Sequence, residues 1–186
     1  LWSFQFDDDN QGLNEEWFKQ TDFCTQEIVV PFVYQTEKSG IHDLTAHDIV
    51  WYQKEVEIIK DLEKDVILHF GAVDYEADIF VNGVGAYHHE GGNTSFEFNI
   101  TPFLNDEGLQ NIVVRVFDPH TDETIPRGKQ IWESESTGIW YTNSTGIWQS
   151  VWYEIVPKVH LSTINLTPRY DEGQVEIEAI LSSYTD

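Results

Sequence analysis

Residues 82–101 of this 186-residue chain read NGVGAYHHEGGNTSFEFNIT, and this stretch decides the fold class. The strand-like run 75–81 leads directly into the Asn-Gly pair, which readily adopts the positive φ angles of a two-residue hairpin turn. A second reversal is predicted at Gly91-Gly92, and apolar and polar residues then alternate over 96–100 as in a half-buried strand. The stretch therefore predicts consecutive antiparallel strands.

Short runs of the same kind recur along the whole chain. We predict strands at residues 2–7, 28–30, 50–59, 66–70, 75–81, 95–100, 111–117, 147–156, 159–166 and 174–181. A single helical turn is predicted around Trp17, and long helical periodicity is missing. Many short strands separated by turns predict an all-β protein, a β-sandwich of jelly-roll type.

Composition narrows the classes of function. The chain has 33 acidic and 10 basic residues, and a surface with this net charge of -23 repels nucleic acid and anionic membranes. No run of about 18 apolar residues occurs, so no membrane-spanning helix is predicted. The single cysteine, Cys24, has no neighbour in sequence that would lower its pKa, which predicts an unreactive thiol.

Several motifs follow one another in a recognisable order. They are Ile28–Pro31, Leu68–Tyr75, His89–Glu97, Asn111–Val116 and Ser144–Trp152. Together they resemble the N-terminal sugar-binding domain of family 2 glycoside hydrolases, the β-galactosidase and β-glucuronidase group. The segment 89–97 is similar to the glucuronidase pattern HQGGYTPFE, whereas Gln149 stands where the closing motif of the family usually has arginine.

The resemblance implies a domain order and an activity. Residues 1–157 are expected to form a jelly-roll sandwich like that of galactose-binding domains, and residues 158–186 to begin an immunoglobulin-like domain. The two catalytic glutamates of the family lie in a barrel that would follow, so the parent is expected to be a retaining glycosidase. We expect no catalytic residue, metal or cofactor in this chain, and no activity from it alone.

The resemblance also implies partners. A β-glycoside would bind in the active site of the parent, and the immunoglobulin-like and barrel domains would contact this one in a homo-oligomeric protein. A cytoplasmic bacterial location is expected, with secretion as the alternative. The chain starts inside a predicted strand and contains no methionine, which indicates an excised fragment.

The long polar segment 119–141, here called the arm, is the candidate functional loop. It exceeds the length of an ordinary connection, and in the family a loop of the first domain reaches toward the mouth of the barrel. Aromatic rings stack on sugars, and amide and amino groups bond their hydroxyls. The candidate substrate-binding residues are Lys129, Gln130, Trp132, Trp140 and Tyr141. The alternative is that the two tryptophans hold the arm against its own sandwich or against the following domains.

One departure leaves the sugar open. The best-known members of the family place an aspartate a few residues before the closing Gly-Ile, where it touches the sugar. The nearest positions in this chain are Trp140 and Tyr141, neither of them acidic. The contact is therefore supplied differently or lost, and galactoside and glucuronide remain alternatives.

Two other polar motifs are given structural roles. His88 and His89 are neighbours on a predicted strand and point to opposite faces, so they do not suit one metal ion, and His89 is expected to pack in its hairpin. The acidic loop Asp7–Asn10 lacks the ligand spacing of a calcium loop, which favours a solvated turn over a calcium site.

Two other functions compete with an accessory domain of a glycosidase. One is a stand-alone carbohydrate-binding module with an aromatic platform formed by Trp132, Trp140 and Tyr141. The other is a scaffold or interaction domain that supports self-association of the parent.

Overall fold

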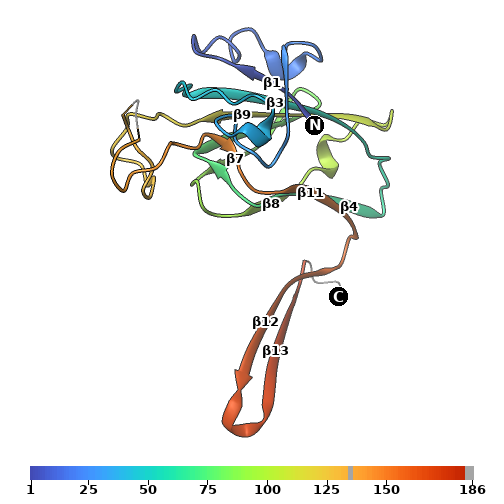
Figure 1. Ribbon diagram of the computed structural model, residues 1–186. Coiled ribbons are helices and arrows are strands. Elements are labelled where there is room, and N and C mark those ends of the chain that lie inside the picture. The colour runs from blue at the N-terminus through green and yellow to red at the C-terminus, as the bar shows by residue number, and fades with distance from the viewer. Residues whose placement is uncertain (134–135, 183–186) are drawn as a thin grey trace.

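A computed structural model describes residues 1–133 and 136–182 and shows a β-sandwich with a projecting hairpin (Figure 1). The larger sheet has six strands in the order β2-β1-β3-β9-β6-β7, all antiparallel to their neighbours. Its strands are β1 (Trp2–Phe6), β2 (Gln26–Ile28), β3 (Ile49–Glu57), β6 (Glu76–Val81), β7 (Val84–Glu90) and β9 (Leu109–Phe117). The prediction of an all-β jelly-roll sandwich is confirmed.

The second layer consists of two smaller sheets. One has the order β11-β4-β8, and the other pairs β10 with β5. Their strands are β4 (Lys64–Phe70), β5 (Val73–Asp74), β8 (Phe96–Asn99), β10 (Gly146–Ile147) and β11 (Val151–Pro157). Four single 3-10 turns complete the described residues: η1 (Trp17–Lys19), which matches the predicted turn, η2 (Glu37–Ser39), η3 (Thr101–Phe103) and η4 (Tyr170–Glu172).

Strand β9 shows how the sequence pattern builds the core. Ile112, Val114 and Val116 point between the two layers, where burial of apolar surface stabilises the sandwich. Val113 points the other way and packs with Trp51 beneath aromatic residues of the N-terminal segment. The central strands of the large sheet are therefore buried on both faces.

The predicted Asn-Gly hairpin is present between β6 and β7. Asn82 has φ 50° and Gly83 has φ 78°, the conformation that this dipeptide adopts at low cost. The Asn82 amide donates to the carbonyl of Phe103 at 2.9 Å, and its oxygen accepts the Asn111 N–H at 2.9 Å. The turn residue thus ties the hairpin to β9 as well as reversing the chain.

The predicted strand 147–156 is in fact two strands in different sheets. β10 pairs with β5, and β11 pairs with β4 after a bend at residues 148–150. Gly146 has φ +106°, and a Cβ there would lie 2.0 Å from the Tyr52 hydroxyl oxygen. Only glycine fits this position, because a side chain would be strained by the backbone and would collide with a buried ring.

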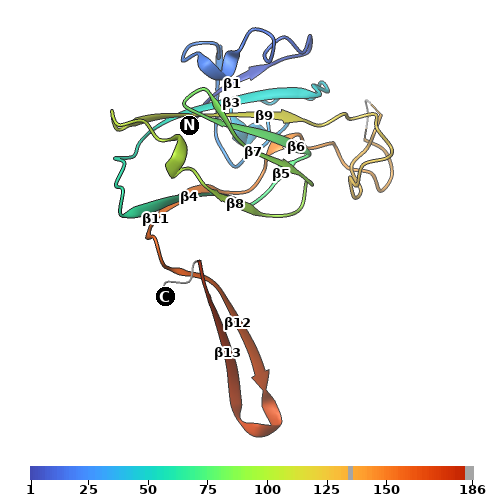
Figure 2. The same cartoon turned by 180° about the vertical axis from the view of Figure 1, so that it is seen from behind.

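The last strands form a separate hairpin, β12 (Leu161–Arg169) with β13 (Gln174–Leu181). It projects away from the sandwich in both views (Figures 1 and 2). Every residue of the two strands is exposed, although Ile164, Leu166 and Ile177 give one face an apolar surface. In the described part of the chain no helix has the length and apolar character to cross a membrane.

Candidate functional site

The arm extends from one end of the sandwich, and the chain leaves the sandwich for the hairpin at the opposite end (Figures 1 and 2). Arg127 closes the base of the arm. Its guanidinium donates to the carbonyls of His120 at 2.8 Å, Pro119 at 3.1 Å and Asp122. A guanidinium that bonds three carbonyls holds a segment without regular secondary structure in one conformation.

The two limbs of the arm are joined by a short parallel bridge between Gln130 and Tyr141. The Tyr141 N–H donates to the carbonyl of Lys129 at 2.8 Å, and the Ile131 N–H donates to the carbonyl of Tyr141 at 2.7 Å. Ile131, the residue that follows Gln130 in this bridge, is buried. Gln130 and Tyr141 are consequently held side by side by backbone hydrogen bonds.

A cavity of about 390 Å³ lies where the arm meets the sandwich, and we call it the Asp74 cavity. Its walls combine a loop after β2, the β5 strand, the turn before β8 and the returning limb of the arm. The lining residues are Pro31, Phe32, Val33, Thr36, Asp74, Asn93, Gln130, Tyr141, Thr142, Ser144 and Trp148. Aromatic surface beside a few placed polar groups is typical of a small-molecule site.

Asp74 is the one acidic side chain among these lining residues, and none of them is basic. The carboxylate is 6% exposed, and its Oδ2 accepts a hydrogen bond from the Gln130 amide at 2.7 Å. A Cβ on Gly92 would lie 2.2 Å from Asp74 Oδ1. Gly92 therefore lets the turn approach the carboxylate at a distance that a larger residue would prevent.

Two further hydrogen bonds connect the walls of the cavity. Gln130 Oε1 accepts the Ser144 N–H at 2.6 Å, so one side chain of the arm links β5 to the segment that follows the arm. Trp148 Nε1 donates to the carbonyl of Gly92 at 2.7 Å. Three segments that are distant in sequence are thus held around the carboxylate of Asp74.

Burial, and to a smaller extent the nearby negative charge of Asp118, raise the pKa of Asp74 from 3.8 to about 7. The Gln130 hydrogen bond and the charge of Arg127 oppose this rise. Burial also raises the pKa of Asp118, against a hydrogen bond from the Thr145 hydroxyl at 2.5 Å. An acid that titrates near neutral pH inside a cavity is a candidate functional group.

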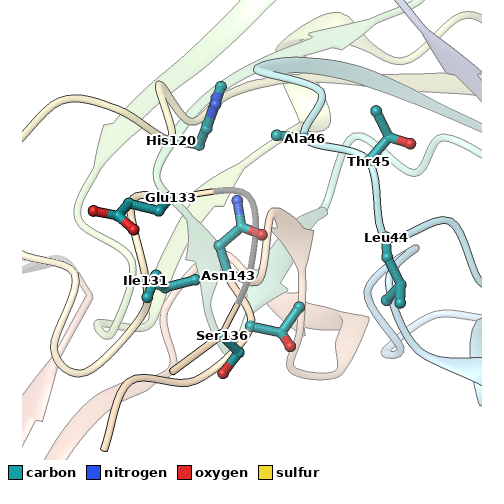
Figure 3. Close-up of a pocket in the computed structure, with 9 residues that line it drawn as sticks. Leu44, Thr45, Ala46, His120, Ile131, Glu133, Ser136 and Asn143 are labelled. Carbon is teal, nitrogen blue, oxygen red and sulfur yellow. The ribbon is translucent and has the colours of Figure 1, made fainter. Parts of the chain in front are cut away.

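A second cavity of about 630 Å³ shares Thr142 with the lining of the Asp74 cavity, and Figure 3 shows residues that line it. His120, Glu133 and Asn143 line one side, and the loop 44–46 lines the other. The His120 ring nitrogen Nδ1 lies 2.5 Å from Asp48 Oδ1, so this histidine is already engaged by the protein.

The structure separates the five candidate residues of the arm. Gln130 and Tyr141 line the Asp74 cavity, and Tyr141 is 64% exposed. Trp132 and Trp140 pack edge to face at 4.9 Å between ring centres and line neither cavity. Lys129 is exposed and also lies outside both linings. The three aromatic residues therefore do not form one flat platform.

Asp74 and Trp148 belong to the site but were not predicted for it. Asp74 interrupts an apolar run between Val73 and Tyr75, which is an unusual place for an acid and the one signal available in the sequence. Trp148 lies in the closing motif, where its ring could equally be a core residue. Their convergence on Gly92 depends on sheet pairing between β5 and β10.

The motifs to which we gave structural roles are engaged by the protein itself. His88 Nδ1 lies 2.8 Å from Asp78 Oδ1, whereas His89 stacks on Phe96 with ring centres 4.0 Å apart. The prediction of a solvated turn at Asp7–Asn10 was wrong for Asp7, which is buried because its carboxylate accepts the Trp51 indole N–H at 2.9 Å, whereas Asp8, Asp9 and Asn10 are exposed. Within residues 1–133 and 136–182, no group of three or more His, Cys, Asp or Glu side chains is placed to hold a metal ion.

Cys24 lies half-buried in the N-terminal segment. Burial raises the pKa of its thiol to about 12, so the thiolate is scarce at neutral pH. The prediction of an unreactive thiol is consistent with this environment.

The family model described as "Glycosyl hydrolases family 2, sugar binding domain" matches residues 1–154. The chain belongs to this family. The match ends three residues before Pro157, the last residue of β11, so it spans the sandwich and the arm. The family resemblance noted in the sequence is confirmed.

Two curated relatives illustrate the extent of this family 2 domain. The β-glucuronidase of Rattus norvegicus is 26% identical over 149 residues, which cover 73% of this chain and 23% of the relative. The β-glucuronidase of Homo sapiens is 30% identical over 145 residues, which cover 69% of this chain and 22% of the relative. The chain thus spans less than a quarter of the length of these relatives.

Solved structures give the same family 2 architecture. A β-glucuronidase from an uncultured Clostridium sp. superimposes with a TM-score of 0.77 at 25% identity, over 98% of this chain and 32% of that one. A Ruminococcus gnavus β-glucuronidase in complex with D-glucuronic acid superimposes with a TM-score of 0.72 at 17% identity, over 98% of this chain and 33% of that one, and supports the fold alone.

Proposed function

We propose that this family 2 domain is the N-terminal, non-catalytic part of a longer retaining β-glycosidase of the β-glucuronidase type. Its Asp74 cavity would form one edge of the sugar pocket. The substrate would be a β-glycoside, and the catalytic carboxylates would lie in a following barrel.

The observation that carries this proposal is the convergence of three segments on one carboxylate beside exposed aromatic surface. Gln130 and Tyr141 from the arm, Asp74 from β5 and Trp148 line a single cavity. Rings of this kind stack on sugars, and amide and carboxylate groups bond hydroxyls. The naming of the relatives as β-glucuronidases supports a glycoside as the substrate.

The hairpin β12–β13 supports the proposal that this domain belongs to a longer protein with further modules. An amphipathic two-stranded sheet is marginally stable in water and needs further strands or a packing partner. We therefore assign residues 158–186 to the beginning of an immunoglobulin-like module. Because the arm and the chain exit lie at opposite ends of the sandwich, the following modules must fold back along it to reach the Asp74 cavity (Figure 1).

The test is a glycosidase assay of the full-length protein that carries this chain. With 4-nitrophenyl glycosides as substrates, we expect hydrolysis of the β-D-glucuronide and retention of anomeric configuration by NMR. The 186-residue chain should give no hydrolysis above buffer. Absence of activity toward every 4-nitrophenyl β-glycoside would contradict the proposal.

A stand-alone carbohydrate-binding module is the second candidate, favoured by the exposure of Tyr141 at the mouth of the cavity. Calorimetric titration of the 186-residue chain with galactosides, glucuronides and xylo-oligosaccharides separates the two. Sub-millimolar binding that is lost in Tyr141→Ala but kept in Trp140→Ala would support the module.

A further inference from the structure

We propose that Asp74 determines substrate specificity by accepting hydrogen bonds from hydroxyl groups of the bound glycoside, on the side of the sugar ring that bears no carboxylate. This inference rests on the proposed function. Asp74 would thus select glycosides by the hydroxyl groups on the part of the ring that faces the sandwich.

The hydrogen bonds of Asp74 leave one of its oxygens available. Oδ2 accepts from Gln130, whereas among the residues that the structure describes Oδ1 has no hydrogen-bond donor and is not one of the fully buried atoms without a partner. The side chain is 6% exposed yet lines the cavity, so the surface that remains is the surface a ligand would meet. A buried carboxylate with an uncommitted oxygen gains free energy when a hydroxyl donates to it.

The position of the carboxylate is fixed before any ligand binds. Gln130 is held by its own acceptance of the Ser144 N–H at 2.6 Å, and it holds Asp74 at 2.7 Å. The carboxylate also packs directly against Gly92, where a Cβ would lie 2.2 Å from Oδ1, so the turn limits its movement on that side. A preorganised acceptor discriminates strongly between ligands, because a substrate that lacks the matching hydroxyl leaves it without a partner.

The charges around the cavity define the class of substituent. No lining residue is basic, and the nearby Arg127 guanidinium is bonded to three carbonyls, so a carboxylate of the sugar would meet Asp74 rather than a lining cation. Hydroxyls of the ring are therefore expected to face this chain, and a uronate carboxylate to face the following domains. Phe32, Tyr141 and Trp148 supply the apolar surface for the carbon skeleton.

Titration of Asp74 provides an independent signal of the contact. A donated hydroxyl stabilises the ionised form, so binding lowers the pKa of Asp74 from its value of about 7 and releases protons at pH 7. The other charged groups that act on Asp74 are Asp118, whose charge raises the pKa, and Arg127, whose charge lowers it.

The first experiment compares Asp74→Asn with wild type in the full-length protein. For 4-nitrophenyl β-D-glucuronide, kcat/KM should fall by about 10- to 100-fold, the effect of losing a hydrogen bond to a charged group. The 3-deoxy and 4-deoxy analogues each lack one ring hydroxyl. For the analogue that lacks the hydroxyl contacted by Asp74, the substitution should lower kcat/KM by less than about threefold. An equal fall for all three substrates, or no fall in an active enzyme, would overturn the inference.

Asp118→Asn is the matched control, because Asp118 is also a buried acid with a raised pKa but lies outside the cavity lining. Its preference among the three substrates should equal that of wild type. Its acid limb in the pH profile of kcat/KM should shift to lower pH, since one negative charge beside Asp74 is removed.

A measurement on the wild type keeps the inference testable if Asp74→Asn does not fold. Calorimetry of D-glucuronic acid binding at pH 7, in phosphate and in Tris, should show release of up to about half a proton, because Asp74 is about half protonated there. No release would contradict the contact. If the wild-type enzyme hydrolyses no glycoside, the proposed function fails, whereas an active enzyme without proton release or hydroxyl selectivity refutes only the role of Asp74.

Discussion

The sandwich and the terminal hairpin are built from strands with similar apolar content, yet they differ completely in burial. Trp51 in β3 is fully buried, whereas Leu166 in β12 is 63% exposed. In the sandwich each strand packs against a second layer, but the hairpin meets no second layer among the described residues (Figure 1). Apolar alternation therefore shows that a strand needs a partner, and the rest of the polypeptide decides whether that partner is present.

The largest test of this contrast pairs a core substitution with one in the hairpin. Trp51→Ala should lower the free energy of unfolding by about 3–5 kcal/mol, because it opens a cavity and removes the hydrogen bond to Asp7. Leu166→Ala should change it by less than about 0.5 kcal/mol. Urea denaturation of the 186-residue chain measures both, and similar losses for the two variants would contradict the division.

The buried acid of the site should make the stability of the sandwich depend on pH. In the folded chain Asp74 binds its proton up to about pH 7, whereas in the unfolded chain it loses it near 3.8. Stability is therefore lost as pH rises between these values, by up to about 4 kcal/mol. Asp74→Asn should be more stable than wild type at pH 8 and should flatten this part of the profile, as measured by thermal unfolding from pH 4 to 8.

Asp118→Asn tests whether buried acids cause the loss of stability as pH rises. Burial raises the pKa of Asp118 as well, so its removal should flatten the profile in the same direction. A wild-type stability that rises between pH 4 and pH 7 would show that other carboxylates dominate.

The close approach of the turn to Asp74 predicts a smaller effect. Gly92→Ala would place a Cβ 2.2 Å from Asp74 Oδ1 and should cost about 1–3 kcal/mol through overpacking. Gly85→Ala is the matched control, because the nearest atom to its Cβ is 4.0 Å away, in ordinary contact. Chemical denaturation of both variants measures the difference, and equal stabilities would mean that the turn relaxes freely.

The smallest effect is expected from removal of the hairpin. Truncation after Pro157 removes strands whose residues are all exposed, together with an exposed ion pair between Lys158 and Asp65. The free energy of unfolding of the sandwich should change by less than about 0.5 kcal/mol. A loss above about 1 kcal/mol in urea denaturation would show that the hairpin belongs to the same cooperative unit.

Local signals were sufficient for much of the fold. The Asn-Gly hairpin, the alternation in β9 and the turn at Trp17 depend on residues close in sequence, and the structure confirms all three. The strand predicted at 147–156 was wrong in its continuity, because the bend between β10 and β11 is set by pairing with two different sheets. Pairing with distant strands leaves little trace in a local pattern.

The candidate site also has residues that the sequence predicted and residues that only the structure revealed. Residue types favourable to sugars pointed to the arm, and two of its five candidates, Gln130 and Tyr141, line the cavity. Asp74 and Trp148 join them only through the β5–β10 ladder and the hydrogen bond from Trp148 to Gly92. Trp132 and Trp140 pack on each other, which composition alone does not distinguish from packing on a ligand.

By itself the sequence determined the all-β class, the main hairpin, the family and the length of the arm, because periodicity, turn chemistry and motif order are properties of neighbouring residues. The tertiary structure alone decided that an acid within an apolar run becomes the polar centre of a cavity. Burial and the charge of Asp118 raise the pKa of that acid against the Gln130 hydrogen bond and the charge of Arg127, and these groups lie far apart in the chain.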